Sequence, residues 1–161
     1  MNIDWNAGKP GDPAAAAATA GPRLRKLIAA ARIELPIPAT RFDEVSAILE
    51  ATLASQALSG HVTYSVQSLA AQLANVLDDP ADATPVAHTL MTLAQSVAAI
   101  GGYLEAGVTH VEWNAARDTR VCPACRANSA AGIVPIGKPF PSGGVMPPGC
   151  QGCRCSLLPG P

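Results

Sequence analysis

Aromatic and charged side chains are scarce in this 161-residue chain, at 4% and 14% of the residues, and the formal net charge is only −1. So weak a net charge gives no indication of a strong phosphate-binding patch. The chain also lacks the roughly eighteen consecutive apolar residues of a membrane span. Its first residues show no basic stretch followed by an apolar one. We therefore expect no membrane span, no secretory signal, and synthesis in the cytosol.

The bland surface that follows from this composition suits a component of a larger assembly. Alanine enrichment in a GC-rich genome explains the same composition without any partner.

Motifs of common enzyme classes are also missing. The sequence has no serine nucleophile elbow, no H-E-x-x-H metal motif and no glycine loop of the kind that cradles phosphate. Its three histidines, His61, His88 and His110, are far apart along the chain, and Glu112 is the only carboxylate near Asp118. We therefore expect neither an enzymatic activity nor a small-molecule substrate.

The five cysteines all follow residue 121. Four of them form two C-x-x-C pairs, Cys122-Pro-Ala-Cys125 and Cys150-Gln-Gly-Cys153, and Cys155 comes two positions later. Two such pairs can supply the four thiolates that structural Zn²⁺ prefers, and a reducing cytosol keeps thiols available for a metal. We predict a structural zinc site with Cys122, Cys125, Cys150 and Cys153 as its ligands.

Cys155 is the alternative fourth ligand, because in an extended strand it faces the same side as Cys153. We favour Cys153, since the x-x spacing makes a tight turn whose amides also hydrogen-bond to sulfur, and we then expect Cys155 to be a small buried hydrophobe. Two other interpretations stay open. One is a thioredoxin-like dithiol at Cys122 and Cys125, which requires a βαβ setting that the pattern lacks; the other is disulfide pairing with one cysteine left over.

The whole chain divides into three regions. Residues 1–21 are rich in Gly, Pro and Ala, contain few large apolar side chains, and are predicted to form an extended N-terminal arm. Residues 22–107 are predicted to form a helical domain, and residues 108–161 a zinc-binding C-terminal module. Charge divides along almost the same line, with six basic and ten acidic residues up to residue 108 and five basic and two acidic residues after it.

Apolar residues in the middle region recur with helical spacing and predict one buried stripe on each helix. These stripe residues are Leu24, Leu27, Ile28 and Ala31, then Phe42, Val45, Ile48, Leu49 and Leu53, then Val66, Leu69, Leu73 and Val76, and finally Leu90, Leu93, Val97 and Ile100. Pro22 suits the first turn of a helix, Thr40 and Thr84 suit N-caps, and Gly60 suits a helix stop. Short connections between the helices favour a small antiparallel bundle. The four predicted helices cover about residues 22–35, 40–58, 63–77 and 84–104.

After Gly107 the pattern becomes strand-like over residues 108–113, 132–136 and 154–158. The long loop before Cys150 is rich in Gly and Pro and has no apolar run to offset the entropy that is lost on ordering. We expect the metal to supply the missing constraint. The predicted fold is mainly α, a small antiparallel helical bundle followed by a small β-rich, zinc-ribbon-like C-terminal module.

The C-terminal motif resembles the signature of a known family. Its residues are Glu112-Trp113, then Asp118-Thr-Arg120-Val-Cys122-Pro-Ala-Cys125, then Gly132, Pro147 and Cys150, and finally Cys153-Arg154-Cys155 and Pro159. This order is similar to that of the phage Mu protein F-like minor head, or head morphogenesis, family, where a tryptophan, an Asp-x-Arg-x-Cys-x-x-Cys run and a glycine strand precede His-Pro-x-Cys-Arg-Cys. The resemblance covers residues 108–159. Where the family has His-Pro, this chain has Cys150-Gln151, an exchange that keeps a zinc ligand in place.

The resemblance implies a minor component of the virion head, assembled in the host cytoplasm. Its partners would be portal or major capsid subunits, with packaged DNA as a further contact, and its role would lie in head assembly and genome packaging. Trp113 would pack beside the cysteines and Arg120 would brace their turn. Activities fused to longer members of the family are not implied for this chain.

A nucleic-acid-binding zinc module is the second function class. Its phosphate contacts would come from the basic residues of the C-terminal module, and binding would then fall steeply with salt. Solvated surface charge explains the same residues without any ligand. The residues in question are Arg117, Arg120, Arg126, Lys138 and Arg154.

Overall fold

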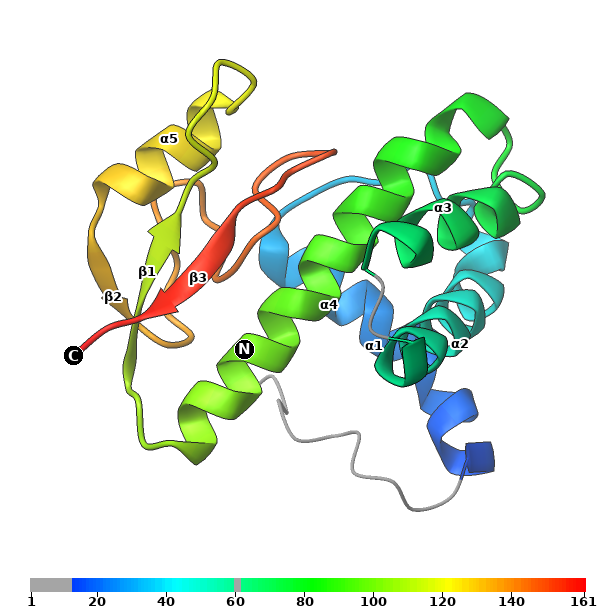
Figure 1. Cartoon of the computed structure of the whole chain (residues 1–161), viewed down its shortest axis with the longest axis horizontal. Coiled ribbons are helices and arrows are strands. Elements are labelled where there is room, and N and C mark those ends of the chain that lie inside the picture. Colours follow the sequence, from blue (N-terminus) through cyan, green and yellow to red (C-terminus); the bar gives the residue numbers. More distant parts are fainter. Residues whose placement is uncertain (1–12, 60–61) are drawn as a thin grey trace.

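The structure, a computed structural model, describes residues 13–59 and 62–161. Four long helices come first, and a small three-stranded antiparallel sheet with one short helix follows them, so the chain is mainly helical as predicted (Figure 1). None of the described helices is long and apolar enough to cross a membrane. The helices are α1 (Pro13–Ala31), α2 (Phe42–Ser59), α3 (Val62–Leu73), α4 (Ala83–Glu105) and α5 (Pro123–Ala130), with 3₁₀ turns η1 (Ala39–Arg41) and η2 (Pro80–Asp82).

Helix α1 begins earlier than its sequence predicts. It starts at Pro13, so residues 13–21, which were expected to belong to an extended arm, are helical. The remainder of the predicted arm, residues 1–12, lies outside the described residues. Alanine has the highest helix propensity, and the alanine-rich segment extends the helix on the N-terminal side of Pro22, which was expected in the first turn.

The same helix ends at Ala31, four residues before the expected end at Leu35, which precedes Pro36. Arg32 adopts a left-handed backbone conformation with φ of 59°. The N–H of Arg32 donates to the carbonyl of Ala29, and the N–H of Ile33 donates to the carbonyl of Ile28. This pair of bonds is a Schellman motif, which satisfies carbonyls at the helix end and turns the chain away.

Two predicted N-caps are wrong for a shared reason, since a 3₁₀ turn precedes each helix. Thr40 lies within η1, and Thr84 lies inside α4, which begins after η2. The cap that forms is Asp79, whose carboxylate accepts the N–H of Ala81 at 2.9 Å and so begins η2. Gly60, the predicted helix stop, lies outside the described residues.

Successive helices pack against one another, and their predicted apolar stripes form the core. Most of the residues expected on those stripes are buried, and the rest pack partly buried against them. The buried stripe positions are Leu24, Ile28, Ala31, Val45, Leu49, Leu69, Leu73, Val76, Leu90, Leu93 and Ile100.

The sheet contains three strands close to the predicted segments: β1 (His110–Asn114), β2 (Ile133–Pro135) and β3 (Ser156–Pro159). Strand β1 is central, and both neighbours run antiparallel to it. Val111 and Trp113 are buried while Glu112 between them is exposed, as expected for a strand with one covered face. Trp113 is paired in register with Leu157 of β3.

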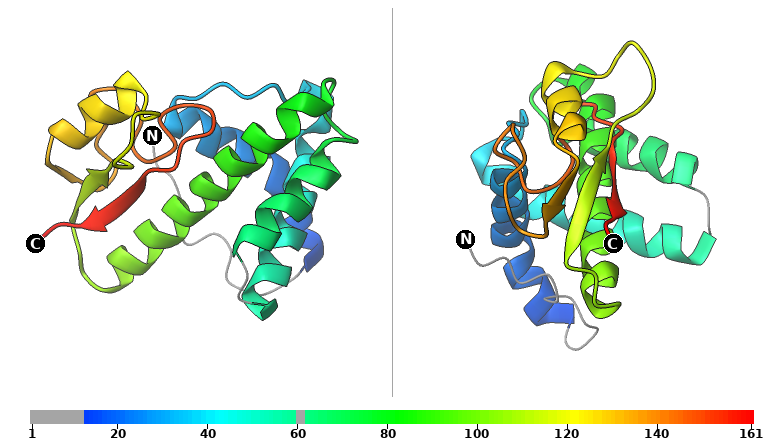
Figure 2. Two further views of the ribbon diagram at one scale, coloured as in Figure 1. Left: turned by 45° about the horizontal axis from the view of Figure 1, so that its top comes forward. Right: turned by 90° about the vertical axis from the view of Figure 1, so that its left-hand side faces the viewer.

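Helix α4 crosses the molecule between the other long helices and the sheet (Figures 1 and 2). Strand β3 packs against α4, and α5 packs against β1. The hydroxyl of Tyr103, near the end of α4, donates to the carbonyl of Leu157 at 3.0 Å. Buried side chains of the helical and C-terminal regions belong to one continuous core, so the two regions are packed together rather than joined only by a linker.

The long loop between β2 and β3 has more anchors than its sequence suggests. The side chain of Asn128, fully buried in α5, donates to Ser142 Oγ and accepts the N–H of Ser142, both at 2.9 Å. Phe140 packs edge-on against Trp113, with ring centroids 5.1 Å apart. The expectation that nothing within the loop could offset its ordering entropy is therefore wrong, because Ser142 and Phe140 anchor it; the constraint expected from a metal stays a prediction.

Candidate metal centre

The first C-x-x-C pair lies at the beginning of α5. Cys122 is the N-cap residue, and its Sγ accepts the N–H of Cys125 at 3.4 Å. Pro123 occupies the first turn, where its missing N–H costs nothing. The sequence pattern does not predict this helix, because a thiol is not among the preferred N-cap side chains. The proline and the alanines that follow it do favour a helix.

The second pair lies just before β3 and is held by α4. The N–H of Cys153 donates to the carbonyl of Cys150 at 3.2 Å and closes a tight turn. Thr92 Oγ1 donates to the carbonyl of Cys153, and the N–H of Gly152 donates to Thr89 Oγ1, both at 2.7 Å. The sequence does not predict a role for these two threonines. The pattern that could have indicated one is the presence of two buried hydroxyl side chains among the core positions of α4.

The five cysteine sulfurs cluster, but the four predicted ligands do not form a single mutually close set, because Cys153 groups with Cys155 rather than with Cys122 and Cys150. The Sγ atoms of Cys122, Cys125 and Cys150, which we call the outer triad, lie within 4.8 Å of one another. Those of Cys125, Cys153 and Cys155, the inner triad, do the same. Only Cys125 belongs to both triads, and its Sγ is 3.6 Å from that of Cys153.

The spacings within each triad fit a thiolate metal site, whereas the Sγ of Cys153 is not within 4.8 Å of all three outer sulfurs. Four sulfurs at about 2.3 Å from a tetrahedral zinc ion are about 3.8 Å from one another. Cys155 is buried, as expected, but its sulfur belongs to the inner triad and is more than an apolar filler. The N–H of Cys155 also donates to the Sγ of Cys153 at 3.5 Å, the kind of bond that orients a metal-binding sulfur.

A buried polar atom beside the cluster supports the same conclusion. Trp113 is fully buried, and its indole Nε1 finds no hydrogen-bond partner among the described residues. Its ring lies beside the cluster, because a Cβ added at Gly149 would meet both the Trp113 ring and the sulfur of Cys125. Buried N–H groups rarely lack an acceptor, and a negatively charged thiolate cluster is an acceptor that would account for this one.

The thiols perturb one another strongly. Hydrogen bonds from Cys125 and then Cys153 lower the pKa of Cys155. Burial opposes the ionisation of Cys122, yet hydrogen bonds from Cys150 and from the Cys125 amide outweigh it and lower the Cys122 pKa. Hydrogen bonds to Cys153 and Cys155 raise the pKa of Cys125, and burial raises that of Cys150 to about 12. Neighbouring thiols therefore cannot all ionise together unless a cation compensates their charge.

The structure also bears on the dithiol and disulfide interpretations. Cys122 at a helix N-cap with a lowered pKa is a feature of reactive dithiols. However, β1 and β2, which flank α5, are antiparallel, so the βαβ unit that the thioredoxin-like interpretation requires is not formed by these elements. All five cysteines are free thiols, and no disulfide links them.

Gly149 leaves the space that the cluster occupies. A Cβ at this position would lie 2.9 Å from Cys125 Sγ and 3.1 Å from Trp113 Cζ2. We predict that Gly149→Ala destabilises the protein by about 1–3 kcal/mol, the usual cost of overpacking, and weakens metal binding. Urea unfolding and a zinc-chelator competition measure the two effects.

Gly102→Ala is the matched control, because Gly102 is exposed in α4 and a Cβ there meets nothing within 4 Å. It should be neutral or stabilising by up to about 1 kcal/mol. If Gly149→Ala behaves like the control, the Cys125 sulfur and the Trp113 ring do not lie against Gly149.

An ion pair braces the turn before α5. Arg154 donates to the Asp118 carboxylate at 2.7 Å, and the backbone N–H of Arg120 donates to its other oxygen at 2.9 Å. These hydrogen bonds, Arg154 first, lower the pKa of Asp118. The guanidinium of Arg120 is 3.7 Å from Asp118 and its side chain is 78% exposed, so the closer brace of this turn is Arg154.

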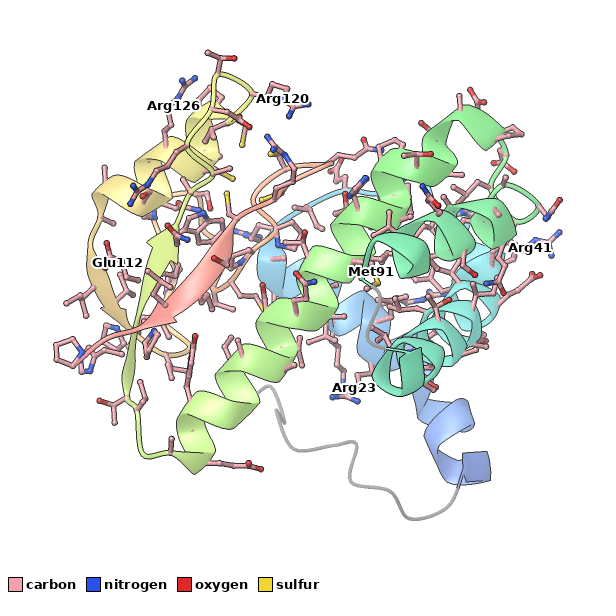
Figure 3. All side chains as sticks on the ribbon, viewed as in Figure 1. Arg23, Arg41, Met91, Glu112, Arg120 and Arg126 are labelled. Carbon is pink, nitrogen blue, oxygen red and sulfur yellow. The ribbon has the colours of Figure 1, made fainter. Side chains whose placement is uncertain are left out.

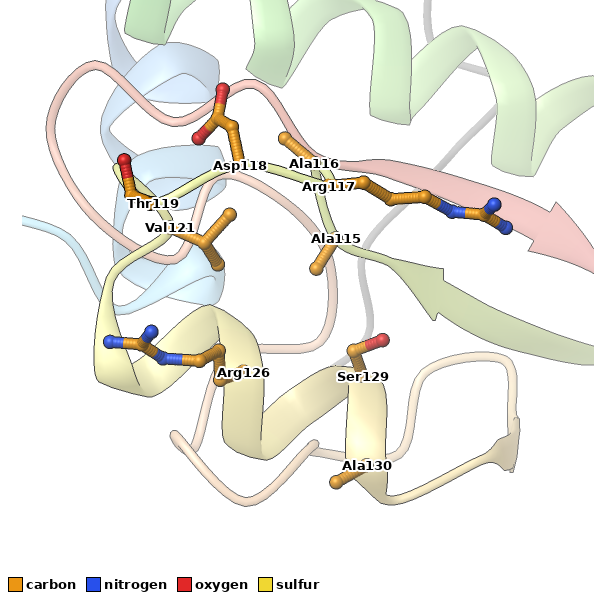
Figure 4. A pocket seen from close by; sticks show the side chains of 9 residues that line it. All are labelled: Ala115, Ala116, Arg117, Asp118, Thr119, Val121, Arg126, Ser129 and Ala130. Atoms are coloured by element: carbon orange, nitrogen blue, oxygen red, sulfur yellow. The ribbon is translucent and has the colours of Figure 1, made fainter.

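The remaining basic residues are distributed around the module. Arg117 and Arg126 line an open depression of about 630 Å³ between the end of β1 and α5 (Figure 4), and neither pairs with a carboxylate in the described part of the chain. Arg120 and Arg126 project from this same end of the module (Figure 3). Lys138 lies elsewhere, in the turn after β2.

No family model, no curated protein and no solved structure matches this chain.

Proposed function

We propose that this chain is a non-enzymatic structural protein whose C-terminal module is held by a zinc ion, and that it acts as a minor component of a phage head. The observation that carries the metal site is the clustering of all five sulfurs from two separate chain segments, residues 122–125 and 150–155. The N–H-bonded sulfurs support it further, as does the indole N–H that lacks a partner within the described chain.

Cys122, Cys125, Cys150 and Cys153 would hold the ion in a zinc-ribbon-like arrangement of two C-x-x-C turns. A bound zinc ion supplies a closed tetrahedral cross-link and no open catalytic position. The protein's own residues position the ligands: the N-cap geometry of α5 orients the first pair, and Thr89 and Thr92 fix the second pair on α4. The cross-link therefore ties the C-terminal module to the helical body.

The head-assembly role is supported by the C-terminal signature. Some residues of that signature, which is spread over residues 108–159, lie beside the cysteines. Trp113 packs beside the cysteines, and Asp118 and Arg154 join the two cysteine segments through their ion pair. A module so fixed to helices with a sparsely charged surface suits a subunit that docks on portal or capsid proteins.

The test is the composition of particles. In purified phage heads whose genome encodes this chain, quantitative mass spectrometry should find it at a small fraction of the copy number of the major capsid subunit. Heads made without its gene should assemble aberrantly or fail to package DNA. Its absence from mature heads and from packaging-competent precursors alike would remove the proposal.

A nucleic-acid-binding module is the second candidate, and one observation favours it. Arg117 and Arg126 line the same depression and lack carboxylate partners within the described residues. If they contact phosphate, log K should fall linearly with log salt with a slope of about −0.9 for each phosphate contacted, and Arg117→Ala with Arg126→Ala should reduce the slope by about two contacts. A slope near zero would eliminate this candidate.

A further inference from the structure

One zinc ion with four thiolates leaves one cysteine of the five without a role. The remaining cysteine is Cys155. Its sulfur forms a triad with those of Cys125 and Cys153, and all three residues are buried. The outer triad is a second set of the same size, and the two share only Cys125. What these two triads can hold rests on the metal site proposed above.

The number of donors decides which ions fit. Two four-coordinate ions that share one sulfur would need seven thiolates, which the chain does not have. Two three-coordinate ions that share one sulfur need five, and the chain has five cysteines, all in this cluster. Soft thiolate ligands select Cu(I), zinc or iron–sulfur clusters. Of these, Cu(I) is the ion that accepts three-coordinate sulfur sites.

We propose that the cluster also accepts two Cu(I) ions, one in each triad, bridged by the Sγ of Cys125. Sulfurs around a trigonal ion at about 2.3 Å are about 4.0 Å apart, which the 4.8 Å limit of both triads accommodates. The site thus holds one zinc ion through four thiolates or two copper ions through five.

The surroundings of the inner triad meet the charge of such a cluster. Two monovalent ions leave more negative charge on five thiolates than one divalent ion leaves on four. Donors lie beside these sulfurs: the Cys155 N–H points to Cys153, and the buried indole N–H of Trp113 finds no other partner among residues 13–59 and 62–161.

A cleft gives metal ions a route to the inner triad. A cavity of about 500 Å³ lies between α3, α4 and the beginning of β3, and Cys155 is part of its lining. Met91 and His88 of α4 line it as well, and thioether and imidazole are donor types that suit copper. Met91 is labelled on α4 in Figure 3. Through this cleft, Cys155 makes the inner triad accessible although all three of its residues are buried.

The experiment loads the full chain anaerobically with Zn²⁺ or with Cu(I) supplied as its glutathione complex, and counts bound ions by native mass spectrometry. The wild type should bind one zinc ion or two copper ions. Cys155→Ser should still bind one zinc ion but only one copper ion. Cys155→Ala, with helical circular dichroism as the check on folding, guards against an effect of the serine itself and should give the same counts.

The outcomes separate the two proposals. One copper ion in the wild type, or two copper ions in both Cys155 variants, would overturn the bridged pair while leaving the zinc site intact. Failure of the wild type to bind either metal would instead overturn the metal site on which this inference rests.

Discussion

Cys125→Ser should abolish stoichiometric zinc binding and unfold the C-terminal module. Cys125 is 1% exposed, is the only thiol in both triads, and lies 3.6 Å from Cys153 across the cluster. Structural zinc contributes on the order of 10 kcal/mol of apparent binding free energy, and losing a ligand at the shared position forfeits most of it. Zinc content by mass spectrometry and thermal unfolding, each with and without chelator, measure the effect.

The matched control is Cys155→Ser, which also replaces a buried cysteine but one outside the four proposed zinc ligands. It should retain one zinc ion and most of the metal-dependent stability. Because the module shares its core with α4, Cys125→Ser should also lower the unfolding temperature of the whole chain. Full zinc content in Cys125→Ser, or chelator-insensitive unfolding of the wild type, would contradict the structural role of the metal.

Trp113→Ala should cost about 3–5 kcal/mol in the free energy of unfolding, as large aromatic truncations in cores do. Trp113 is the largest fully buried side chain described, it packs edge-on against Phe140, and its ring lies beside the space at Gly149. Truncation therefore removes an anchor of the long loop as well as a wall of the metal cluster. Urea unfolding measures the cost.

Leu158→Ala is the control for Trp113→Ala. Leu158 follows Leu157 in β3, points to the opposite face and is 44% exposed, so its truncation should change stability by no more than about 0.5 kcal/mol. Zinc affinity should fall in Trp113→Ala and stay unchanged in Leu158→Ala. A cost below about 1 kcal/mol for Trp113→Ala would mean that the site collapses around the loss and that the loop does not depend on this ring.

The middle region shows how far periodicity alone reaches. The helical spacing of apolar residues predicted which faces of the helices are buried, as at Val45 and Leu49 of α2, Leu69 of α3 and Leu90 of α4. An amphipathic stripe must face the core wherever the helix packs. Helix ends were predicted less well. The left-handed conformation of Arg32 could not be predicted from its residue type, since glycine is the usual residue at this position of a helix end. The chain takes this conformation because the apolar residues that follow pack into the core.

In the site, residue spacing predicted that the thiols of the two C-x-x-C pairs gather in one cluster, and the structure shows that cluster. That four of them hold a single zinc ion stays a prediction. Helix α5 was not predicted because its N-cap side chain is a thiol. The hydrogen bonds from Thr89 and Thr92 to the second C-x-x-C pair were not predicted because they join residues more than sixty positions apart.

Local residue patterns were therefore sufficient for the existence of the four long helices and the three strands, the buried faces of those helices, and a cluster of thiols, but not for α5 or the helical start of α1. Packing of the complete chain was needed to divide these thiols into two triads joined at Cys125, to place the second pair on α4, and to order the loop through Trp113 and Asn128. Periodicity and spacing act over a few residues, whereas the position of a sulfur relative to a distant indole or hydroxyl depends on how the whole core is filled.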